Sequence, residues 1–394
     1  MTKESSGSGI GVVAQPLVRV ESGLCSRFRC TKSKCAACAM VCPVPGAVRF
    51  GDQGAEITAT CVGCGACASA CPNGALQPVE SDQKLAQRIR RKVKQDEPFR
   101  IGCTRSEGEA ELVLPCLGRL TEALVLEALR DGAQRVELLD PDCTGCGLHK
   151  AAPQWERTLQ FTRSLSECAG FDDDQIARRT VPQGKALETP DPSQVNTGRR
   201  ALFRSLADRW KATEIAEAEE QGQPAAPFRE VVRQRNENLK RVDLLAVLAA
   251  LPGAKAEPTP VLAAAVPLAA LEVDSKCVAC DVCETLCPVN ALSHSETNGI
   301  YSLEFDPAIC TGCGICEAAC FHKAIHMRET VDLSVLFERR RVTLISAPRR
   351  SCRSCGEIFL DASSSEFCPS CKLSGSRRDA IARRFFTSGG NLGD

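Results

Sequence analysis

The chain has 394 residues, long enough for about three domains, and its 49 basic and 49 acidic residues give a formal net charge of zero. The balanced charge excludes a bulk electrostatic attraction to nucleic acid or membranes. Aromatic residues make up only 4% of the chain, too few for base-stacking surfaces, so nucleic acid is not expected as a partner.

Export and membrane insertion are not expected either. The segment from Met1 to Leu17 lacks the basic start and apolar run of a secretory signal. The apolar stretches at 244–251 and 261–271 are too short for a membrane span and are broken by prolines. The 26 cysteines occur largely at metal-ligand spacings, which favours a reducing compartment over disulfides. We therefore expect a cytoplasmic protein without a membrane span.

The first cysteine-rich region contains one complete run and the end of another. The complete run is Cys61-x2-Cys64-x2-Cys67-x3-Cys71-Pro72, and Cys35-x2-Cys38-x3-Cys42-Pro43 has the same end but a different start. Three thiolates two residues apart can surround three irons of one cube, because a tight loop turns each side chain inward. The fourth cysteine lies on the following helical turn and points the other way. Gly63 and Gly65 permit the positive φ that such a loop needs.

The start of the incomplete run leaves its first ligand open. Lys32 occupies the expected position and cannot serve, whereas Cys30 and Cys25 lie two and seven residues further upstream. Cys30 needs only a slightly longer loop and is the preferred ligand, with Cys25 as the alternative. If neither serves, the cluster would have three irons or would be absent.

The region from about Phe99 to Gly170 has a different pattern. Apolar segments at 99–102, 111–114 and 135–139 predict strands, and residues 121–129 predict a helix that ends near Gly132. Strand, helix and strand imply a parallel pair with a right-handed crossover. Ligands gather at the carboxyl ends of such strands. Four cysteines are expected there: Cys103, Cys116, Cys143 and Cys146.

Two resemblances concern these four cysteines. Their order is similar to that of thioredoxin-like [2Fe–2S] ferredoxins. The segment from Leu114 to Leu120, followed by helix, strand and Cys143-x2-Cys146, resembles the delta subunit of methyl-viologen-reducing hydrogenases over about 70 residues. The resemblance implies a [2Fe–2S] cluster and a connection to hydrogenase and heterodisulfide reductase. A zinc site, bare thiols or buried structural cysteines remain alternatives, and Cys168 is expected to be a small core residue. A helix starting after Cys116 would lower the pKa of its thiol.

Residues from about 172 to 260 are rich in charge, Ala, Gln and Pro. Helices are expected at 199–221 and 228–251, as connectors that fix the flanking modules relative to each other or to a partner.

Two further complete runs follow. They are Cys277-x2-Cys280-x2-Cys283-x3-Cys287-Pro288 and Cys310-x2-Cys313-x2-Cys316-x3-Cys320, the latter with Phe321 in place of proline. Alanine follows four residues after the last cysteine of each complete run, at Ala75, Ala291 and Ala324. The chain therefore contains an internal repeat.

The runs resemble bacterial-type 2[4Fe–4S] ferredoxins twice, over roughly residues 18–80 and 264–330. That family folds as a small pseudo-symmetric α+β unit of two short hairpins and two helices, and the fourth cysteine of each run ligates the neighbouring cluster. The resemblance implies four [4Fe–4S] clusters. Their ligands would be Cys30 (or Cys25), Cys35, Cys38 and Cys71; Cys42, Cys61, Cys64 and Cys67; Cys277, Cys280, Cys283 and Cys320; and Cys287, Cys310, Cys313 and Cys316.

The last cysteines form two knuckles, Cys352-x2-Cys355 and Cys368-Pro369-x-Cys371. Two such knuckles make a tetrahedral four-thiolate site, and the pattern resembles a zinc ribbon. Rubredoxin-like iron is the alternative, although the aromatic core of a rubredoxin is nearly absent.

The expected fold is α+β and multidomain: a ferredoxin module at 1–90, an α/β cysteine domain at 91–175, a helical and charged linker at 176–260, a second ferredoxin module at 261–335, and a zinc ribbon with a tail at 336–394. The expected function is electron transfer to or from a larger oxidoreductase, of hydrogenase, formate dehydrogenase or heterodisulfide reductase type. The expected partners are its catalytic subunit and an electron donor or acceptor protein, and no catalytic residue is expected within the chain. The alternatives are a redox-active thiol enzyme that uses Cys116, and a redox-sensing protein whose ribbon binds nucleic acid.

Overall fold

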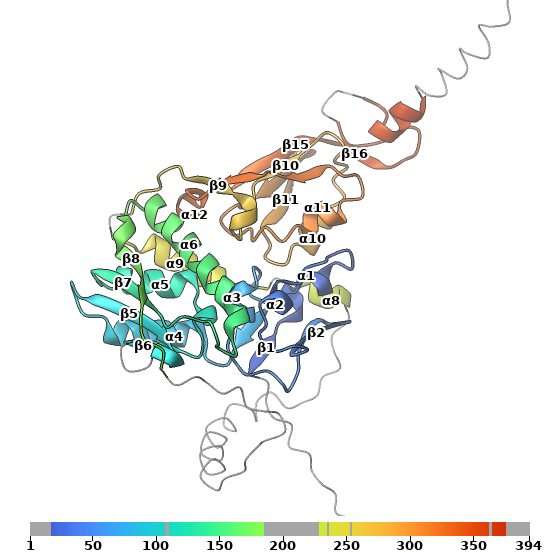
Figure 1. Cartoon of the computed structure of the whole chain (residues 1–394). Coiled ribbons are helices and arrows are strands. Elements are labelled where there is room, and N and C mark those ends of the chain that lie inside the picture. Colours follow the sequence, from blue (N-terminus) through green and yellow to red (C-terminus); the bar gives the residue numbers. More distant parts are fainter. Residues whose placement is uncertain are drawn as a thin grey trace, which may run out of the picture.

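The computed structural model describes residues 17–106, 110–184, 228–234, 236–252, 254–361 and 365–375. Helices and strands are mixed in several domains, and the strands of this part of the chain form six small sheets (Figure 1). The helix expected at 199–221 lies outside the described residues.

The first ferredoxin module is built from two two-stranded antiparallel sheets and short helices. Strand β1 pairs with β4, and β2 pairs with β3. The helices begin directly within or after the cysteine-rich loops. The elements are β1 (Val18–Val20), η1 (Ser22–Leu24), α1 (Ser26–Arg29), α2 (Ala37–Met40), β2 (Val48–Gly51), β3 (Gly54–Ile57), α3 (Ala66–Ala70) and β4 (Leu76–Pro78).

The middle domain contains a four-stranded parallel sheet in the order β6-β5-β7-β8. The strands expected at 99–102, 111–114 and 135–139 are confirmed, as is the helix expected at 121–129. The elements are α4 (Asp82–Lys92), β5 (Pro98–Cys103), η2 (Thr104–Ser106), β6 (Leu112–Leu114), η3 (Leu117–Arg119), α5 (Glu122–Arg130), β7 (Arg135–Asp140), η4 (His149–Ala151), α6 (Ala152–Cys168), η5 (Asp173–Gln175) and β8 (Ile176–Thr180).

The topology differs from the simple strand–helix–strand prediction in two ways. Strands β6 and β7 are not neighbours, because β5 lies between them and pairs with both. The edge strand β8 belongs to this sheet, although the sequence assigns its residues to the linker. The 17-residue helix α6 was not predicted, because its buried side includes Thr158, Thr162 and Ser166 and so lacks a clear apolar period.

The expected helix at 228–251 is two helices, α8 (Phe228–Arg233) and α9 (Leu239–Ala249). Asn238 begins α9, since its side-chain oxygen accepts a hydrogen bond from the N–H of Arg241 at 3.3 Å. Its side-chain nitrogen donates to the carbonyl of Pro72 at 2.9 Å. The same residue therefore caps the helix and anchors it to the first ferredoxin module.

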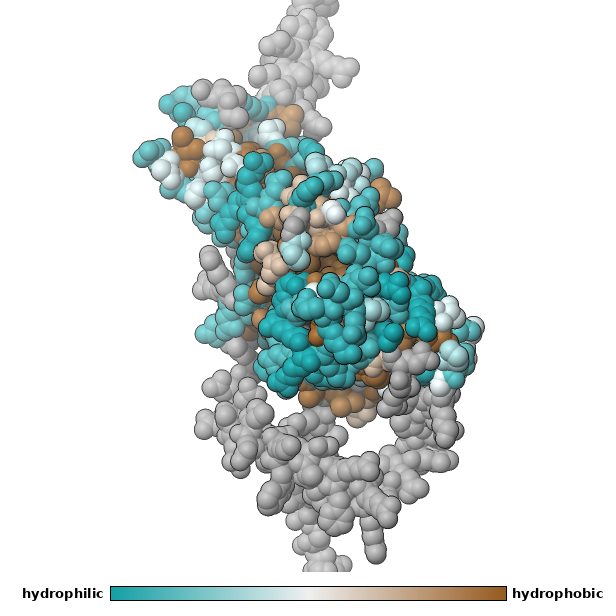
Figure 2. Space-filling model, turned by 90° about the vertical axis from the view of Figure 1, so that its left-hand side faces the viewer, coloured by the Kyte–Doolittle hydropathy of each residue, from teal (hydrophilic) through white to brown (hydrophobic). Residues whose placement is uncertain are grey.

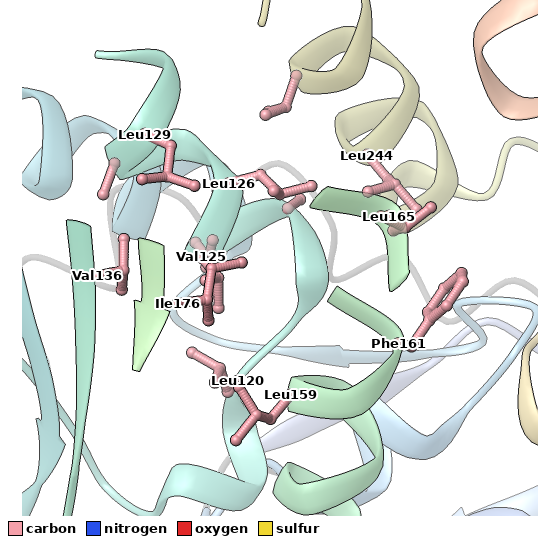
Figure 3. Packing of buried hydrophobic residues seen from close by; sticks show 14 of the residues in the cluster. Leu120, Val125, Leu126, Leu129, Val136, Leu159, Phe161, Leu165, Ile176 and Leu244 are labelled. Atoms are coloured by element: carbon pink, nitrogen blue, oxygen red, sulfur yellow. The ribbon is translucent and has the colours of Figure 1, made fainter. Parts of the chain in front are cut away.

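The largest hydrophobic core joins the middle domain to α9. Figure 3 shows Leu165 of α6 beside Leu244 of α9, with Leu126 of α5 pointing toward them and Val125 of α5 beside Ile176 of β8. Cys168 is fully buried in the same core, as expected. Helix α9 is therefore a structural part of the middle domain and not a free connector.

The second ferredoxin module repeats the pattern of the first. In both modules a strand before the cysteine runs pairs antiparallel with a strand after them, here β10 with β13. The β11–β12 hairpin is extended by β15, which also pairs with β16 of the C-terminal ribbon. The elements are β9 (Pro260–Leu262), η6 (Ala263–Ala265), β10 (Leu271–Val273), α10 (Val282–Leu286), β11 (Leu292–Thr297), β12 (Ile300–Phe305), α11 (Ile315–Ala319), β13 (Ile325–Met327), β14 (Thr330–Asp332), α12 (Val335–Glu338), β15 (Val342–Ser351) and β16 (Ile358–Leu360).

The ribbon and the middle sheet lie at opposite ends of the described structure, with the two ferredoxin modules between them (Figure 1). The face shown in Figure 2 is mainly hydrophilic, with small hydrophobic areas between the polar residues. Among the described residues, no helix has both the length and the apolar character needed to cross a bilayer.

Substitution of Leu165 by Ala tests whether α6 belongs to the core. The side chain of Leu165 is 0% exposed, so its truncation should cost about 2–5 kcal/mol of unfolding free energy. Leu239→Ala is the matched control, because Leu239 is 44% exposed and its truncation should change stability little. Denaturant unfolding followed by circular dichroism measures both. Equal losses in the two variants would contradict the packing described here.

Candidate metal centres

The cysteine loops share one unusual backbone conformation. In each complete run, the residues on either side of the second cysteine have positive φ. They are Gly63 and Gly65, Ala279 and Asp281, and Gly312 and Gly314, with φ between 56° and 77°. Left-handed backbone is costly for residues other than glycine. Its presence at Ala279 and Asp281 indicates that the loop conformation itself is required in all three runs.

A repeated N–H···S hydrogen bond explains why an alanine follows four residues after the last cysteine of each complete run. The backbone N–H of Ala75 lies 3.3 Å from Cys71 Sγ, and those of Ala291 and Ala324 lie 3.2 Å from the sulfurs of Cys287 and Cys320. Each N–H donates to the sulfur four residues before it. Such N–H···S bonds stabilise a thiolate and tune any metal that it binds.

In the first module, the thiols fall into two sets that exchange their last cysteines. Cys42 joins Cys61, Cys64 and Cys67 in the outer N-terminal set, and burial together with these thiolates raises the pKa of Cys67. Cys71 joins Cys38 and Cys35 in the inner N-terminal set. Burial raises the pKa of Cys38 to about 12, and the thiolates of Cys71, Cys35 and Cys25 raise it further.

Cys25 is therefore the candidate that the structure brings to the inner N-terminal set. It precedes α1 and packs with Cys38, Cys67 and Cys71 in one cluster. A Cβ at Gly54 would lie 2.7 Å from the Cys25 sulfur, so the β2–β3 turn covers it closely. Cys30 is buried at the other end of α1. The geometry thus favours Cys25 over the Cys30 that loop length alone suggests.

The second module has the same exchanged arrangement. The outer C-terminal set contains Cys320 with the first three cysteines of its run, Cys277, Cys280 and Cys283, and burial raises the pKa of Cys283 to about 12. The inner C-terminal set contains Cys287 with Cys310, Cys313 and Cys316. Burial raises the pKa of Cys310 to about 12, and Cys313 and Cys287 add to this.

The middle set contains Cys103, Cys116, Cys143 and Cys146, which the sheet brings together as predicted. Cys103 ends β5, while Cys116 and Cys143 follow β6 and β7. Burial raises the pKa of Cys116 to about 12 and that of Cys143 to about 11. The expected lowering at Cys116 is wrong, because only the short turn η3 follows it and burial outweighs the N–H of Gly118, 3.4 Å from its sulfur.

Electrostatic contacts place the five sets in a row. At each junction, burial raises the pKa of one thiol and the thiolate of a neighbouring set raises it further. The junctions are Cys283 with Cys316, Cys35 with Cys313, Cys38 with Cys67, and Cys64 with Cys116.

Direct packing and hydrogen bonds support two of these junctions. Cys64 packs in one hydrophobic cluster with Cys116 and Cys146. Between the two ferredoxin modules, the Thr311 hydroxyl donates to Asn73 Oδ1 at 2.5 Å. Within the first module, the side-chain nitrogen of Asn73 donates to the carbonyl of Leu24 at 3.0 Å and so holds Asn73 in place. A buried hydrogen bond therefore joins the modules next to their inner sets.

These sets fit metal binding. Buried thiols that raise one another's pKa cannot all ionise unless a positive charge lies between them. A metal supplies that charge, and thiolate is the form that binds it. All-thiolate donor sets of this kind suit iron–sulfur clusters and zinc.

The ribbon contains a more compact group. The sulfurs of Cys352, Cys355, Cys368 and Cys371 all lie within 4.8 Å of one another. The N–H of Cys368 lies 3.3 Å from Cys352 Sγ, and this hydrogen bond is the largest of the effects that lower the pKa of Cys352 to about 6. A four-thiol site is therefore formed at this end of the chain.

Sequence reasoning missed the buried cations near the thiols. Lys240 of α9 donates to the carbonyls of Ser69 and Cys71, both at 2.7 Å. Arg29 and Arg241 are also buried next to cysteine sets. No local pattern marks them, because a basic residue on a short helix normally faces solvent. Only the tertiary fold buries Arg29 and Arg241 and half-buries Lys240.

Comparison with known families agrees with the geometry of two of these regions. Residues 276–324 match the 4Fe-4S dicluster domain, and residues 57–77 match the 4Fe-4S binding domain. A search of curated proteins found no match. The chain therefore contains two ferredoxin-type 4Fe-4S domains, which indicates an iron–sulfur protein of electron transport.

Substitution of Cys25 or Cys30 by Ser tests which of the two cysteines is the first ligand of the inner N-terminal set. Cys25→Ser should lower the iron content by up to about four atoms per chain, because the inner N-terminal set loses a thiolate. Cys30→Ser is the matched control and should keep the full content. Iron and acid-labile sulfide are measured on protein purified without oxygen. Loss of iron from Cys30→Ser alone would assign the ligand to Cys30 instead.

Proposed function

We propose that the chain is an electron-transfer subunit that binds four [4Fe–4S] clusters through the inner and outer sets of its two ferredoxin modules. The observation that carries this proposal is the exchange of the last cysteine between the two sets of each module. That exchange is the ligation pattern of two-cluster ferredoxins. When bound, such clusters supply one-electron reduction and oxidation without bond making in the protein.

The residues of the chain have distinct roles in this proposal. The thiolates hold the irons, and the left-handed loops let backbone N–H groups approach the sulfurs. The N–H groups of Ala75, Ala291 and Ala324 favour the more negative, reduced state. The row of five neighbouring cysteine sets supports the transport of electrons from one set to the next.

We assign a [2Fe–2S] cluster to the middle set. The middle set lies beside Cys64 of the outer N-terminal set, which supports a role as the electron carrier at one end of the row of five sets. The resemblance to hydrogenase delta subunits suggests a partner of hydrogenase, formate dehydrogenase or heterodisulfide reductase type, by analogy only. A reducing compartment, the cytoplasm, would keep these thiols available.

We assign zinc to the ribbon, where it would have a structural or docking role. Arg350 pairs with Asp361 at 3.4 Å and Arg353 with Glu366 at 2.9 Å. Arg349 lies 3.3 Å from Glu296. Because these three arginines already face carboxylates, they offer little free positive charge to a nucleic acid.

The thiol-enzyme alternative requires an accessible, acidic thiol at Cys116. Cys116 is half-buried and its pKa is raised, and both features oppose this role. Iodoacetamide should therefore leave Cys116 unmodified in the folded, reduced protein.

Metal analysis of the native protein tests the proposal. Four cubes require about 16 irons per chain, the binuclear cluster raises this to about 18, and the ribbon adds about one zinc. The protein is purified without oxygen, and iron, zinc, sulfide and co-purifying proteins are determined. A molybdenum, nickel or flavin subunit among them would identify the partner class. Zinc in place of iron, with no labile sulfide, would contradict the proposal.

A further inference from the structure

Two buried arginines reach the inner C-terminal set from outside its own module. Arg29 comes from α1 of the first module and Arg241 from α9 of the middle domain. Arg29 is 1% exposed and Arg241 is 5% exposed. Neither has a carboxylate within ion-pair distance in the part of the chain that the structure describes.

Arg29 is held entirely by neutral groups. Its guanidinium donates to backbone carbonyls from three different segments, which include the last turn of α8 and α10. The acceptors are the carbonyls of Gly23, Val232 at 3.0 Å, Thr285 at 3.2 Å and Gln234 at 3.3 Å. Burial lowers its pKa, while the thiolates of Cys287 and Cys313 raise it. Its nearest compensating charges therefore belong to the inner C-terminal set.

Arg241 is held less completely. One terminal nitrogen, Nη2, donates to the carbonyl of Pro267 at 2.5 Å. The other, Nη1, is buried without a hydrogen-bond partner among the described residues. Burial lowers the pKa of Arg241, and the charges of Glu122 and Cys310 raise it.

An unpaired guanidinium in a protein interior is strongly destabilising. Buried donors almost always have an acceptor, and an arginine stays protonated throughout the accessible pH range. The orphan nitrogen of Arg241 thus lacks an acceptor, and the negative charges that act on this guanidinium are those of Glu122 and Cys310. A thiolate-ligated cluster is anionic and offers sulfur acceptors, so it matches both requirements.

The outer C-terminal set has the opposite surroundings. Asp281 lies within its loop, accepts a hydrogen bond from the Tyr301 hydroxyl at 2.7 Å, and raises the pKa of Cys277, where burial is the largest cause. Glu284 follows in α10. Arg349 lies 3.8 Å from Asp281 and offsets part of this negative charge. His294 lies 3.7 Å from Asp281, also contacts Glu284, and offsets more of it when protonated. One module therefore holds one set beside buried cations and the other beside a carboxylate.

We propose that Arg29 and Arg241 are the counter-charges of the cluster held by Cys287, Cys310, Cys313 and Cys316, and that they set its reduction potential above that of the cluster held by Cys277, Cys280, Cys283 and Cys320. Reduction adds negative charge, so a fixed positive charge nearby stabilises the reduced form and raises the potential. An electron shared by the two would reside mainly on the inner one, next to the first module. This inference rests on the proposed function.

An EPR-monitored redox titration of the full-length holoprotein tests the inference. Cys313→Ser and Cys280→Ser first assign the signals of the inner and outer C-terminal sets. In the unsubstituted protein, the inner signal should be reduced at the higher potential. Arg241→Met should shift it to lower potential, and Arg241→Lys should retain most of the original value. Arg88→Met is the control, because Arg88 is a surface residue paired with Glu80, and it should shift neither signal.

Asp281→Asn provides a second variant with the opposite sign. It removes the carboxylate next to the outer set and should raise the potential of that set alone. If Arg241→Met fails to assemble its clusters, the order of the inner and outer potentials in the unsubstituted protein still tests the inference.

The outcomes separate this inference from the proposed function. An inner potential at or below the outer one, or an Arg241→Met variant with full iron and an unchanged potential, overturns the inference alone. Absence of iron and labile sulfide from the unsubstituted protein overturns the proposed function as well.

Discussion

Mutual repulsion among buried thiolates is the constraint on which this structure depends. Five sets of thiols lie close enough to raise one another's pKa, and four of them belong to the two small ferredoxin modules. Such modules cannot be stable as thiolates unless cations lie between the sulfurs. The short helices, the left-handed loops and the N–H···S bonds all serve to arrange four sulfurs around one centre. We therefore expect metal binding and folding to be coupled in this chain.

Helix α9 holds the two ferredoxin modules and the middle domain in contact. Its apolar side packs in the core of the middle domain through Leu244 and Leu248. Its first turn reaches the ferredoxin modules: Lys240 bonds to carbonyls of the first, and Arg241 bonds to Pro267 beside the second. One helix thus joins three parts of the chain with half-buried hydrogen bonds. Rigid contacts of this kind suit electron transfer, which falls off steeply with distance.

The cysteine runs could be recognised from sequence because their ligands are local. The resemblance to two-cluster ferredoxins implied the exchanged sets, and spacing indicated the four-thiol ribbon. Strand order brought Cys103, Cys116 and Cys143 to one sheet edge. Cys25 could not be separated from Cys30 by loop length, because the path of α1 decides which sulfur turns inward. The position of β5 between β6 and β7, and the burial of Arg241, depend on contacts between distant segments and leave no local signal.

The most direct test of the account is an EPR spectrum of oxygen-free protein after reduction with dithionite, together with its labile sulfide. The account predicts a brown protein with labile sulfide. Its reduced spectrum should be broadened by magnetic interaction, because the two cysteine sets of each module would hold their clusters side by side. A colourless protein without sulfide and without a paramagnetic signal would contradict the claim that these thiolates hold iron–sulfur clusters.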